Sequence, residues 1–232
     1  MGPACDGLTG PTAALMPSAM SGLIDDLAPA ERLALAYAPA QGRTATLAVL
    51  ALDARLAAIL RARREPIAAQ LRLAWWREML ALPAADWPRG EPVLDLLRGW
   101  RDPSGLVPLA VGWEALLADA LTEEVIAEFV HGRGRAFAAL AQELGVDATA
   151  SAEEAARLWA LADLAAHLSD DDERARALAY GRQLAPPPLP ASLRPLAVLA
   201  GLGARALQRG GKPLLSGFGG TLLALRIGIT GR

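Results

Sequence analysis

The chain has 232 residues, enough for one sizeable hydrophobic core, and its formal net charge of −2 gives no electrostatic basis for binding nucleic acid. Its 53% hydrophobic content is swollen by alanine, which favours helix, and no stretch of about 18 uncharged apolar residues predicts a membrane span. The single Cys5 rules out an intramolecular disulfide and a cysteine metal cluster. No basic segment precedes an apolar run near the N-terminus, so we expect a cytoplasmic protein without a signal peptide.

Glycine, proline, serine and alanine dominate residues 1–24, which we predict to be a flexible tail. In residues 25–232, prolines near helix starts and glycines after helix ends separate a series of amphipathic segments. Thr122 is an expected helix cap, and Ser151 with Glu154 forms a capping-box pattern. No segment alternates with period two for long enough to predict a strand, so the prediction is a single all-α domain, a helical bundle. The expected helices span approximately 29–37, 42–63, 65–83, 92–100, 108–120, 123–144, 151–168, 169–180, 192–208 and 220–229.

The segment 65–79, EPIAAQLRLAWWREM, has a pronounced helical pattern. Ile67, Leu71, Trp75 and Met79 recur every four residues and form the predicted apolar stripe of this helix. Adjacent residues on a helix point about 100° apart, so two neighbouring tryptophans cannot share one narrow face. We therefore expect Trp75 in the core and Trp76 beside a neighbouring surface or cavity.

This segment, with TLAVLALDARLAAILRARR before it, resembles the squalene/phytoene synthase family. In that family a helix with an acidic motif leads through an EP turn into a helix of the form xxRLxWWRxxL. The resemblance extends from about Glu31 to the C-terminus and is specific at 65–80. It implies an all-α domain with the isoprenoid-synthase fold and an apolar pocket. In active members it also implies head-to-head joining of two prenyl diphosphates, with magnesium held by two aspartate-rich motifs.

The first acidic motif is absent where the resemblance places it. Aligned through the EP turn, its aspartate pair falls at Ala57 and Ala58, and its further aspartate falls at Arg61. Asp53, one turn earlier, is the nearest acid. Magnesium that bridges a diphosphate needs hard oxygen ligands, so we expect no metal on this helix face.

The second acidic motif is matched only at its end, where Gly181 and Arg182 fit the family's GRxYLP pattern. Its two aspartates, four residues apart, fall near His167 and Asp171, which makes these two residues weak candidates for metal ligands. The simpler interpretation makes the acids at 170–172 a solvated helix start and His167 a partly buried structural residue.

The segment HGRGR at 131–135 interrupts the apolar pattern of a long predicted helix. Two glycines so close together weaken a helix by about 1 kcal/mol each relative to alanine. One interpretation is a kink beside a cavity, with Arg133 and Arg135 reaching an anion. The other is close helix packing through the glycines, with both arginines exposed.

The resemblance leaves two functional hypotheses and a third, purely structural one. The preferred hypothesis is a non-catalytic lipid-binding or assembly protein, because relatives without the acidic motifs resemble a mitochondrial complex I assembly factor. The alternative is an active prenyltransferase that joins two isoprenoid diphosphates head to head and depends on magnesium. For the preferred hypothesis we expect no cofactor. The expected ligand-binding residues are Gln70, Arg72, Trp76, Arg77, Glu78, Asp53 and Arg182.

The expected partners follow from the same resemblance. They are an isoprenoid or another anionic lipid, and a protein partner in the assembly of a membrane complex. Paired guanidinium groups such as those of Arg72 and Arg77 suit an anionic head group, which they can bind bidentately. We therefore expect a cytoplasmic protein with peripheral contact to the inner membrane and no nucleic acid partner.

Overall fold

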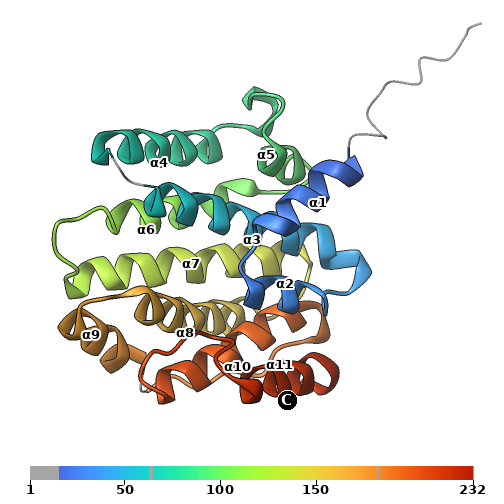
Figure 1. Cartoon of the computed structure of the whole chain (residues 1–232). Helices are drawn as coiled ribbons and strands as arrows, with labels where there is room; N and C mark the ends of the chain where they lie inside the picture. Colours follow the sequence, from blue (N-terminus) through green and yellow to red (C-terminus); the bar gives the residue numbers. More distant parts are fainter. Residues whose placement is uncertain (1–15, 63–64, 182, 232) are drawn as a thin grey trace, which may run out of the picture.

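The chain folds into helices throughout the residues that the computed structural model describes, which are 16–62, 65–181 and 183–231 (Figure 1). No strand occurs in these three segments, so the predicted all-α class is confirmed. None of their helices is both long and apolar enough to cross a bilayer. The eleven α-helices are α1 (Met16–Asp26), α2 (Pro29–Leu35), α3 (Ala40–Arg61), α4 (Pro66–Ala81), α5 (Pro92–Leu97), α6 (Val107–Ala115), α7 (Glu123–Glu143), α8 (Thr149–His167), α9 (Asp171–Gly181), α10 (Arg194–Gln208) and α11 (Phe218–Thr230). Three short 3-10 helices are η1 (Ala84–Asp86), η2 (Pro103–Leu106) and η3 (Ala191–Leu193).

The long helices lie in successive layers across the molecule (Figure 1). From the top of that view the layers are α4 with α5, then α3 with α6, then α7, then α8, and finally α10 with α11. Helix α9 packs against α8, and α2 contacts α3, α10 and α11. The middle layers, α3, α7 and α8, are therefore covered on both sides and hold the core.

Alanine lets the middle layers approach closely. Helix α8 buries Ala155, Ala156, Ala160 and Ala162 completely, so its backbone can lie near both α7 and α10. Trp159 fills the larger space on the same helix, and its ring meets that of Phe137 edge to face at 5.6 Å between centroids. The high alanine content of the sequence is thus part of the packing of the core.

Part of the predicted N-terminal tail is helical. Helix α1 covers Met16–Asp26, so the part of the predicted tail from 16 to 24 is helical, and residues 1–15, with Cys5, lie outside the described residues. Leu23 and Leu27, four residues apart, are buried where α1 meets α3 and α5. These two leucines account for the order of a segment whose composition otherwise suggested a loose chain.

The predicted apolar stripe of α4 is wrong. Ile67 and Leu71 are 73% and 66% exposed, and Trp75 is 37% exposed, whereas Trp76 is only 4% exposed. A strict spacing of four drifts about 40° around the helix at each step, whereas a 4-3-4 spacing stays on one face. The face that packs on the bundle has that spacing and comprises Ala69, Leu73, Trp76 and Leu80.

One predicted helix cap is confirmed, and another is wrong. The Thr122 hydroxyl accepts a hydrogen bond from the backbone N–H of Val125 at 3.4 Å and caps α7. Helix α8 instead begins at Thr149, two residues before Ser151, so the expected capping box of Ser151 is not formed. At the start of α9, Asp170 rather than a serine accepts hydrogen bonds from two backbone N–H groups. The local sequence predicted the approximate start of each of these helices, and packing determined the residue at which its first turn begins.

Candidate functional site

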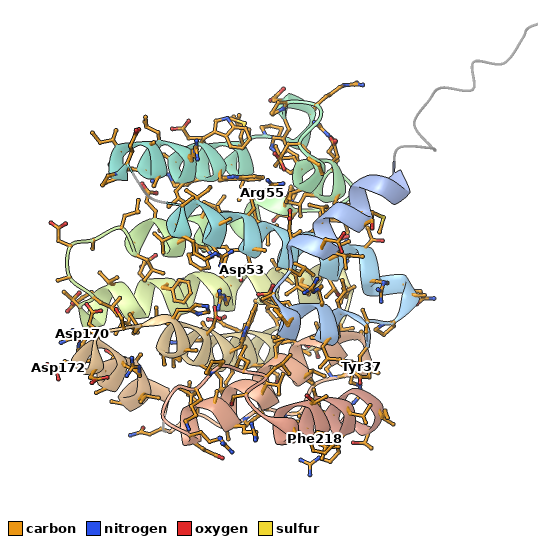
Figure 2. The ribbon with its side chains drawn as sticks, in the orientation of Figure 1. Tyr37, Asp53, Arg55, Asp170, Asp172 and Phe218 are labelled. Carbon is orange, nitrogen blue, oxygen red and sulfur yellow. The ribbon has the colours of Figure 1, made fainter. Side chains whose placement is uncertain are left out.

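Five helices meet at a group of polar side chains in the middle of the bundle. Glu31 comes from α2, Asp53 from α3, Trp113 from α6, Arg133 from α7 and Asp163 from α8, and we call these five residues the central cluster. All five line one small cavity. Figure 2 shows Asp53 near the centre of the molecule, away from its surface.

Arg133 holds the cluster together through ionic hydrogen bonds. Its Nη2 lies 2.9 Å from Oδ2 of Asp53, and its Nε donates to Oδ1 of the same carboxylate at 3.3 Å. Its Nη1 donates to Oδ2 of Asp163 at 3.0 Å. The indole N–H of Trp113 donates to Oδ1 of Asp53 at 2.7 Å. Because Arg133 and Asp53 have side chains only 1% and 2% exposed, these contacts replace water that neither group can reach.

Three aromatic rings surround the guanidinium group of Arg133. Its Cζ lies 4.3 Å from the ring centroid of Trp159, 4.8 Å from that of Phe129 and 5.4 Å from that of Trp113. Ring faces carry negative charge density and attract a cation, more strongly where water is excluded. The rings and the two carboxylates together compensate for the loss of hydration of a buried charge.

Burial and mutual charge shift the pKa values of the cluster. Burial opposes the charge on Arg133, but Asp53 and Asp163 together raise its pKa above the ordinary value. Burial also raises the pKa of Asp53, against the effect of Arg133 and of the Trp113 N–H. The pKa of Glu31 rises from 4.5 to about 8, because Glu31 is buried and faces Asp53 and Asp163. Glu31 therefore carries a proton at neutral pH.

Two glycines on α7 bring Arg133 to this position. A Cβ on Gly132 would lie 2.3 Å from the carbonyl oxygen of Pro108, so only glycine lets α7 pack this closely against the start of α6. A Cβ on Gly134 would lie 2.9 Å from Cγ of Arg157 on α8. The interpretation of close packing through the glycines is therefore correct.

Only one of the two arginines beside these glycines is exposed, as the packing interpretation expects of both. Arg133 is buried and binds protein carboxylates, so it is neither exposed nor reaching toward an external anion. Arg135 is exposed and lies 3.6 Å from Glu153. The sequence carried no sign that one arginine of the pair turns inward.

Only part of each expected acidic motif lies at the cavity of the central cluster. The cavity has a volume of about 120 Å³ and is also lined by Ala57 and Arg61 of α3 and by His167 of α8. Asp163 lies four residues before His167, which is the spacing of the second motif. Asp171, the other weak metal candidate, instead lies exposed at the start of α9 and pairs with Arg174. Asp163 and His167 therefore lie at the cavity, whereas Asp171 does not.

The predicted ligand-binding residues divide between two places. Arg72 and Trp76 line a groove of about 610 Å³ between α3 and α4, together with Arg55, Trp75 and Glu91, and we call it the α3–α4 groove. Asp53 belongs to the central cluster instead.

The other predicted ligand-binding residues do not line the α3–α4 groove. Arg77 is bound by Glu114, with 2.5 Å between Nη1 and Oε2. Gln70 and Glu78 are exposed and do not line this groove. Arg182 lies outside the described residues.

Glu31, Trp113 and Asp163 of the central cluster were missed as site residues, and Arg133 was considered only as a ligand for an anion. Asp163 could have been found, because it precedes His167 at the spacing that the second motif requires. Glu31, Trp113 and Arg133 lie 22, 60 and 80 residues from Asp53, and no local pattern connects them. Their meeting depends on how α2, α6 and α7 pack on α3.

The residues of the central cavity do not fit magnesium. Asp53 and Asp163 both give carboxylate oxygens to Arg133, and Arg61 adds a second positive charge to the cavity wall. Ala57 supplies no ligand atom. Among residues 16–62, 65–181 and 183–231, no group of three or more His, Cys, Asp or Glu side chains is arranged to hold a metal ion.

The chain was compared with protein-family models, with curated proteins and with solved structures, and none of the three comparisons finds a match. Function is therefore inferred from the central cluster and from the grooves on the surface.

Proposed function

We propose that this chain is a non-catalytic protein of the squalene/phytoene synthase type, with an isoprenoid-synthase-like bundle, that acts by binding an anionic lipid or an assembly partner. The resemblance at 65–80 supports this assignment. Further support comes from α3 and α8, which bring Ala57, Arg61 and His167, three of the five positions expected for the two acidic motifs, to a single cavity.

One observation carries the non-catalytic part of the proposal: Arg133 occupies both central carboxylates. Ionisation of a prenyl diphosphate needs metal ions to stabilise the charge of the leaving diphosphate. Asp53 and Asp163 are bonded to a guanidinium group at 2.9 and 3.0 Å and are poorly placed to bind metal as well. The cavity beside them, about 120 Å³, is also below the approximate 300–1,000 Å³ of typical ligand pockets.

The α3–α4 groove is the better candidate for a lipid. Its volume of about 610 Å³ falls in the usual range for ligand pockets. Ile59, Leu71 and Trp75 give it apolar walls for a hydrocarbon chain, while Arg55 and Arg72 can bind an anionic head group. Arg55 lies 3.5 Å from Glu91, a partly buried partner that it would exchange for the ligand.

The alternative remains an active head-to-head prenyltransferase. It would require Arg133 to release Asp53 and Asp163 and the cavity to enlarge severalfold. Each carboxylate freed from Arg133 would leave buried charge uncompensated, which costs several kcal/mol. The binding role is therefore the better supported of the two, and we place the protein in the cytoplasm, peripheral to the inner membrane.

The decisive experiment is a turnover assay. Purified protein is incubated with farnesyl or geranylgeranyl diphosphate, with and without magnesium, and both pyrophosphate and isoprenoid products are measured. We expect no magnesium-dependent release of pyrophosphate. Multiple turnovers to a head-to-head product would overturn the proposal and establish the transferase.

A further inference from the structure

Charge is distributed very unevenly along the chain. Residues 174–232 contain nine lysines and arginines and no aspartate or glutamate, a formal charge of +9. Residues 1–173 contain 14 basic and 25 acidic residues, a formal charge of −11. The small net charge of the whole chain therefore conceals a strongly basic C-terminal part, which forms α10, α11 and most of α9.

Helix α11 presents an apolar face to solvent. Phe218 is 79% exposed, Leu222 50%, Leu225 47% and Ile229 69%. Their 4-3-4 spacing places all four side chains within an arc of about 60°. The opposite face, with Gly220, Ala224 and Ile227, is buried. Figure 2 shows Phe218 at the outer edge of the molecule, and Figure 1 shows α11 as part of its lowest layer. We call the four exposed side chains the α11 apolar face.

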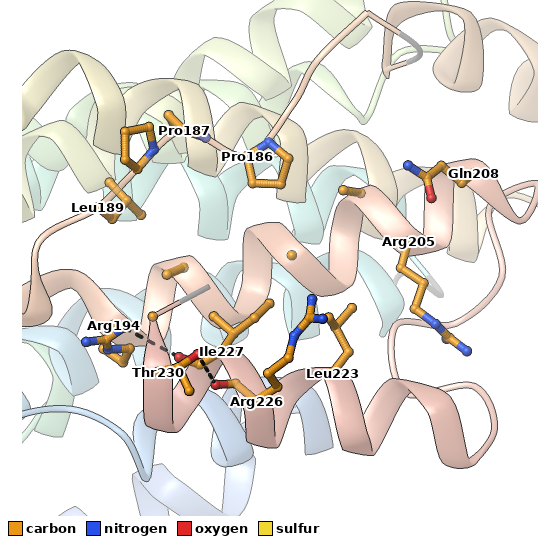
Figure 3. Close-up of a pocket in the computed structure, with 15 residues that line it drawn as sticks. Pro186, Pro187, Leu189, Arg194, Arg205, Gln208, Leu223, Arg226, Ile227 and Thr230 are labelled. Atoms are coloured by element: carbon orange, nitrogen blue, oxygen red, sulfur yellow. Dashed lines mark hydrogen bonds between the residues drawn. The ribbon is translucent and has the colours of Figure 1, made fainter.

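Arginines lie beside this face without acidic partners. A groove of about 830 Å³ between α10, α11 and the proline-rich segment 186–190 is lined by Arg194, Arg205 and Arg226 (Figure 3). Arg194 and Arg205 donate long hydrogen bonds to backbone carbonyl groups of the described residues, at 3.5 and 3.3 Å. In the described part of the chain, no ion pair involves a residue beyond Arg174. Lys212 is also exposed in this part of the chain.

We propose that the α11 apolar face and these basic residues dock the protein onto an anionic membrane surface. A helix with an apolar face flanked by Lys and Arg lies in the plane of the bilayer interface, with its apolar side chains at the boundary between head groups and acyl chains. The 13 residues of α11 span about 20 Å, enough to lie flat but not to cross. Arg194, Arg205 and Arg226 bind the lipid phosphates.

Charge complementarity favours an anionic membrane surface over a second copy of the chain or nucleic acid. A second copy docked through the same face would bring two basic parts of +9 together. Nucleic acid offers phosphates but no apolar layer for Phe218 and Ile229. An anionic bilayer satisfies both the cations and the apolar face. The inference deepens the proposed binding role by naming its surface, and it does not depend on the central cluster or on the α3–α4 groove.

The test is co-sedimentation of the full chain with vesicles of phosphatidylcholine, with and without phosphatidylglycerol. Two double variants remove the proposed contacts, Phe218→Ser with Ile229→Ser and Lys212→Gln with Arg226→Gln. Matched controls change side chains on other elements that are also exposed, Ile67→Ser with Leu82→Ser and Arg89→Gln with Arg157→Gln. Circular dichroism establishes that each variant is folded.

We expect binding only to the vesicles that contain phosphatidylglycerol, and weaker binding as salt is raised. Each test variant should lose about tenfold or more in affinity, since one basic residue near an anionic surface contributes about fivefold. The control variants should bind like the wild type.

Several results would overturn the inference. No vesicle binding, equal binding to neutral vesicles, or equal losses in the controls would each do so. Dimerisation through this face without vesicle binding would assign it to a second copy. Binding of polyglutamate without vesicle binding would assign it to an acidic protein. None of these results would change the outcome of the pyrophosphate assay, so the two proposals fail separately.

Discussion

At the scale of single residues, Arg133 explains most of the behaviour of the central cluster. Its charge is buried with 1% of the side chain exposed, yet Asp53, Asp163 and three aromatic rings surround it. A buried charge of this kind is tolerated only while all its partners are present. Removing one partner therefore costs far more than the net contribution of the intact group.

Arg133→Met should lower the free energy of unfolding by about 3–5 kcal/mol, because it leaves two carboxylates without their cation. Urea unfolding measures this loss. The matched control is Arg135→Met, which breaks an exposed pair with Glu153 and should cost less than about 1 kcal/mol. Similar midpoints for the two variants would show that Arg133 is not the centre of the cluster.

Glu31 should make stability depend on pH. Its pKa is about 8 in the folded protein, against an ordinary glutamate value of 4.5, so folding takes up a proton between these two pH values. The free energy of unfolding contributed by Glu31 therefore falls as pH rises from 4.5 to 8, by about 1.4 kcal/mol per pH unit. Glu31→Gln removes this dependence and keeps an acceptor for the backbone N–H of Ala28.

Thermal unfolding of wild type and Glu31→Gln is measured between about pH 5 and pH 8, roughly the range between the two pKa values of Glu31. The free energy of unfolding of the variant, relative to that of the wild type, should increase steadily as the pH rises through this range. Glu154→Gln, at an exposed position, is the control and should track the wild type at every pH. A constant difference between Glu31→Gln and wild type would contradict the shifted pKa.

At the scale of elements, α4 shows how packing chooses between two faces of one helix. Both stripes are apolar, but only the face with Leu73 and Trp76 meets the bundle. The other face leaves Leu71 and Trp75 beside the α3–α4 groove, with Arg72. The same helix thus contributes to the core through one tryptophan and to a surface groove through its neighbour.

Trp76→Ala should destabilise the fold by about 3–5 kcal/mol, as expected when a buried aromatic side chain is truncated. Trp75→Ala is the natural control, since Trp75 is 37% exposed and Trp76 only 4%. This is the reverse of the order expected from the stripe of Ile67, Leu71 and Met79. The urea midpoints of the two variants measure this difference. A larger loss of stability for Trp75→Ala would support the stripe predicted from the sequence.

Arg72→Ala should weaken the binding of an anionic lipid to the α3–α4 groove by about tenfold, because an ionic hydrogen bond to a head group contributes about 1.5–3 kcal/mol. Quenching of tryptophan fluorescence by a titrated anionic lipid, through Trp75 in the same groove, reports the affinity. Arg89→Ala, an exposed arginine outside the groove, should leave the affinity unchanged. Equal effects of the two substitutions would indicate nonspecific attraction.

At the scale of the whole molecule, one hydrophobic core runs from Leu23 in α1 to Ile227 in α11. The layers share this core, while the surface differs sharply from one end of the molecule to the other. The α4 end carries the α3–α4 groove. The α11 end carries the α11 apolar face and the groove lined by Arg194, Arg205 and Arg226. The two binding surfaces that we propose therefore lie on opposite layers of the molecule.

Unfolding of the chain should be a single cooperative transition, because the described helices share one continuous core. Far-ultraviolet circular dichroism and tryptophan fluorescence should give coincident urea curves. The six tryptophans occur between Trp75 and Trp159 and so report mainly on α4 to α8. A helical signal that persists after the fluorescence transition would show that α10 and α11 unfold separately.

The sequence by itself determined the all-α class, the approximate helices and the Thr122 cap, because these depend on residues within a few positions of one another. The absence of carboxylates at Ala57 and Arg61 was also readable, since it depends on residue identity alone. Only the tertiary structure decided which face of α4 is buried and which arginine of 133 and 135 turns inward. It also decided that Glu31, Trp113 and Asp163 meet at Asp53. These outcomes depend on contacts between helices that are distant in sequence, and no local pattern records them.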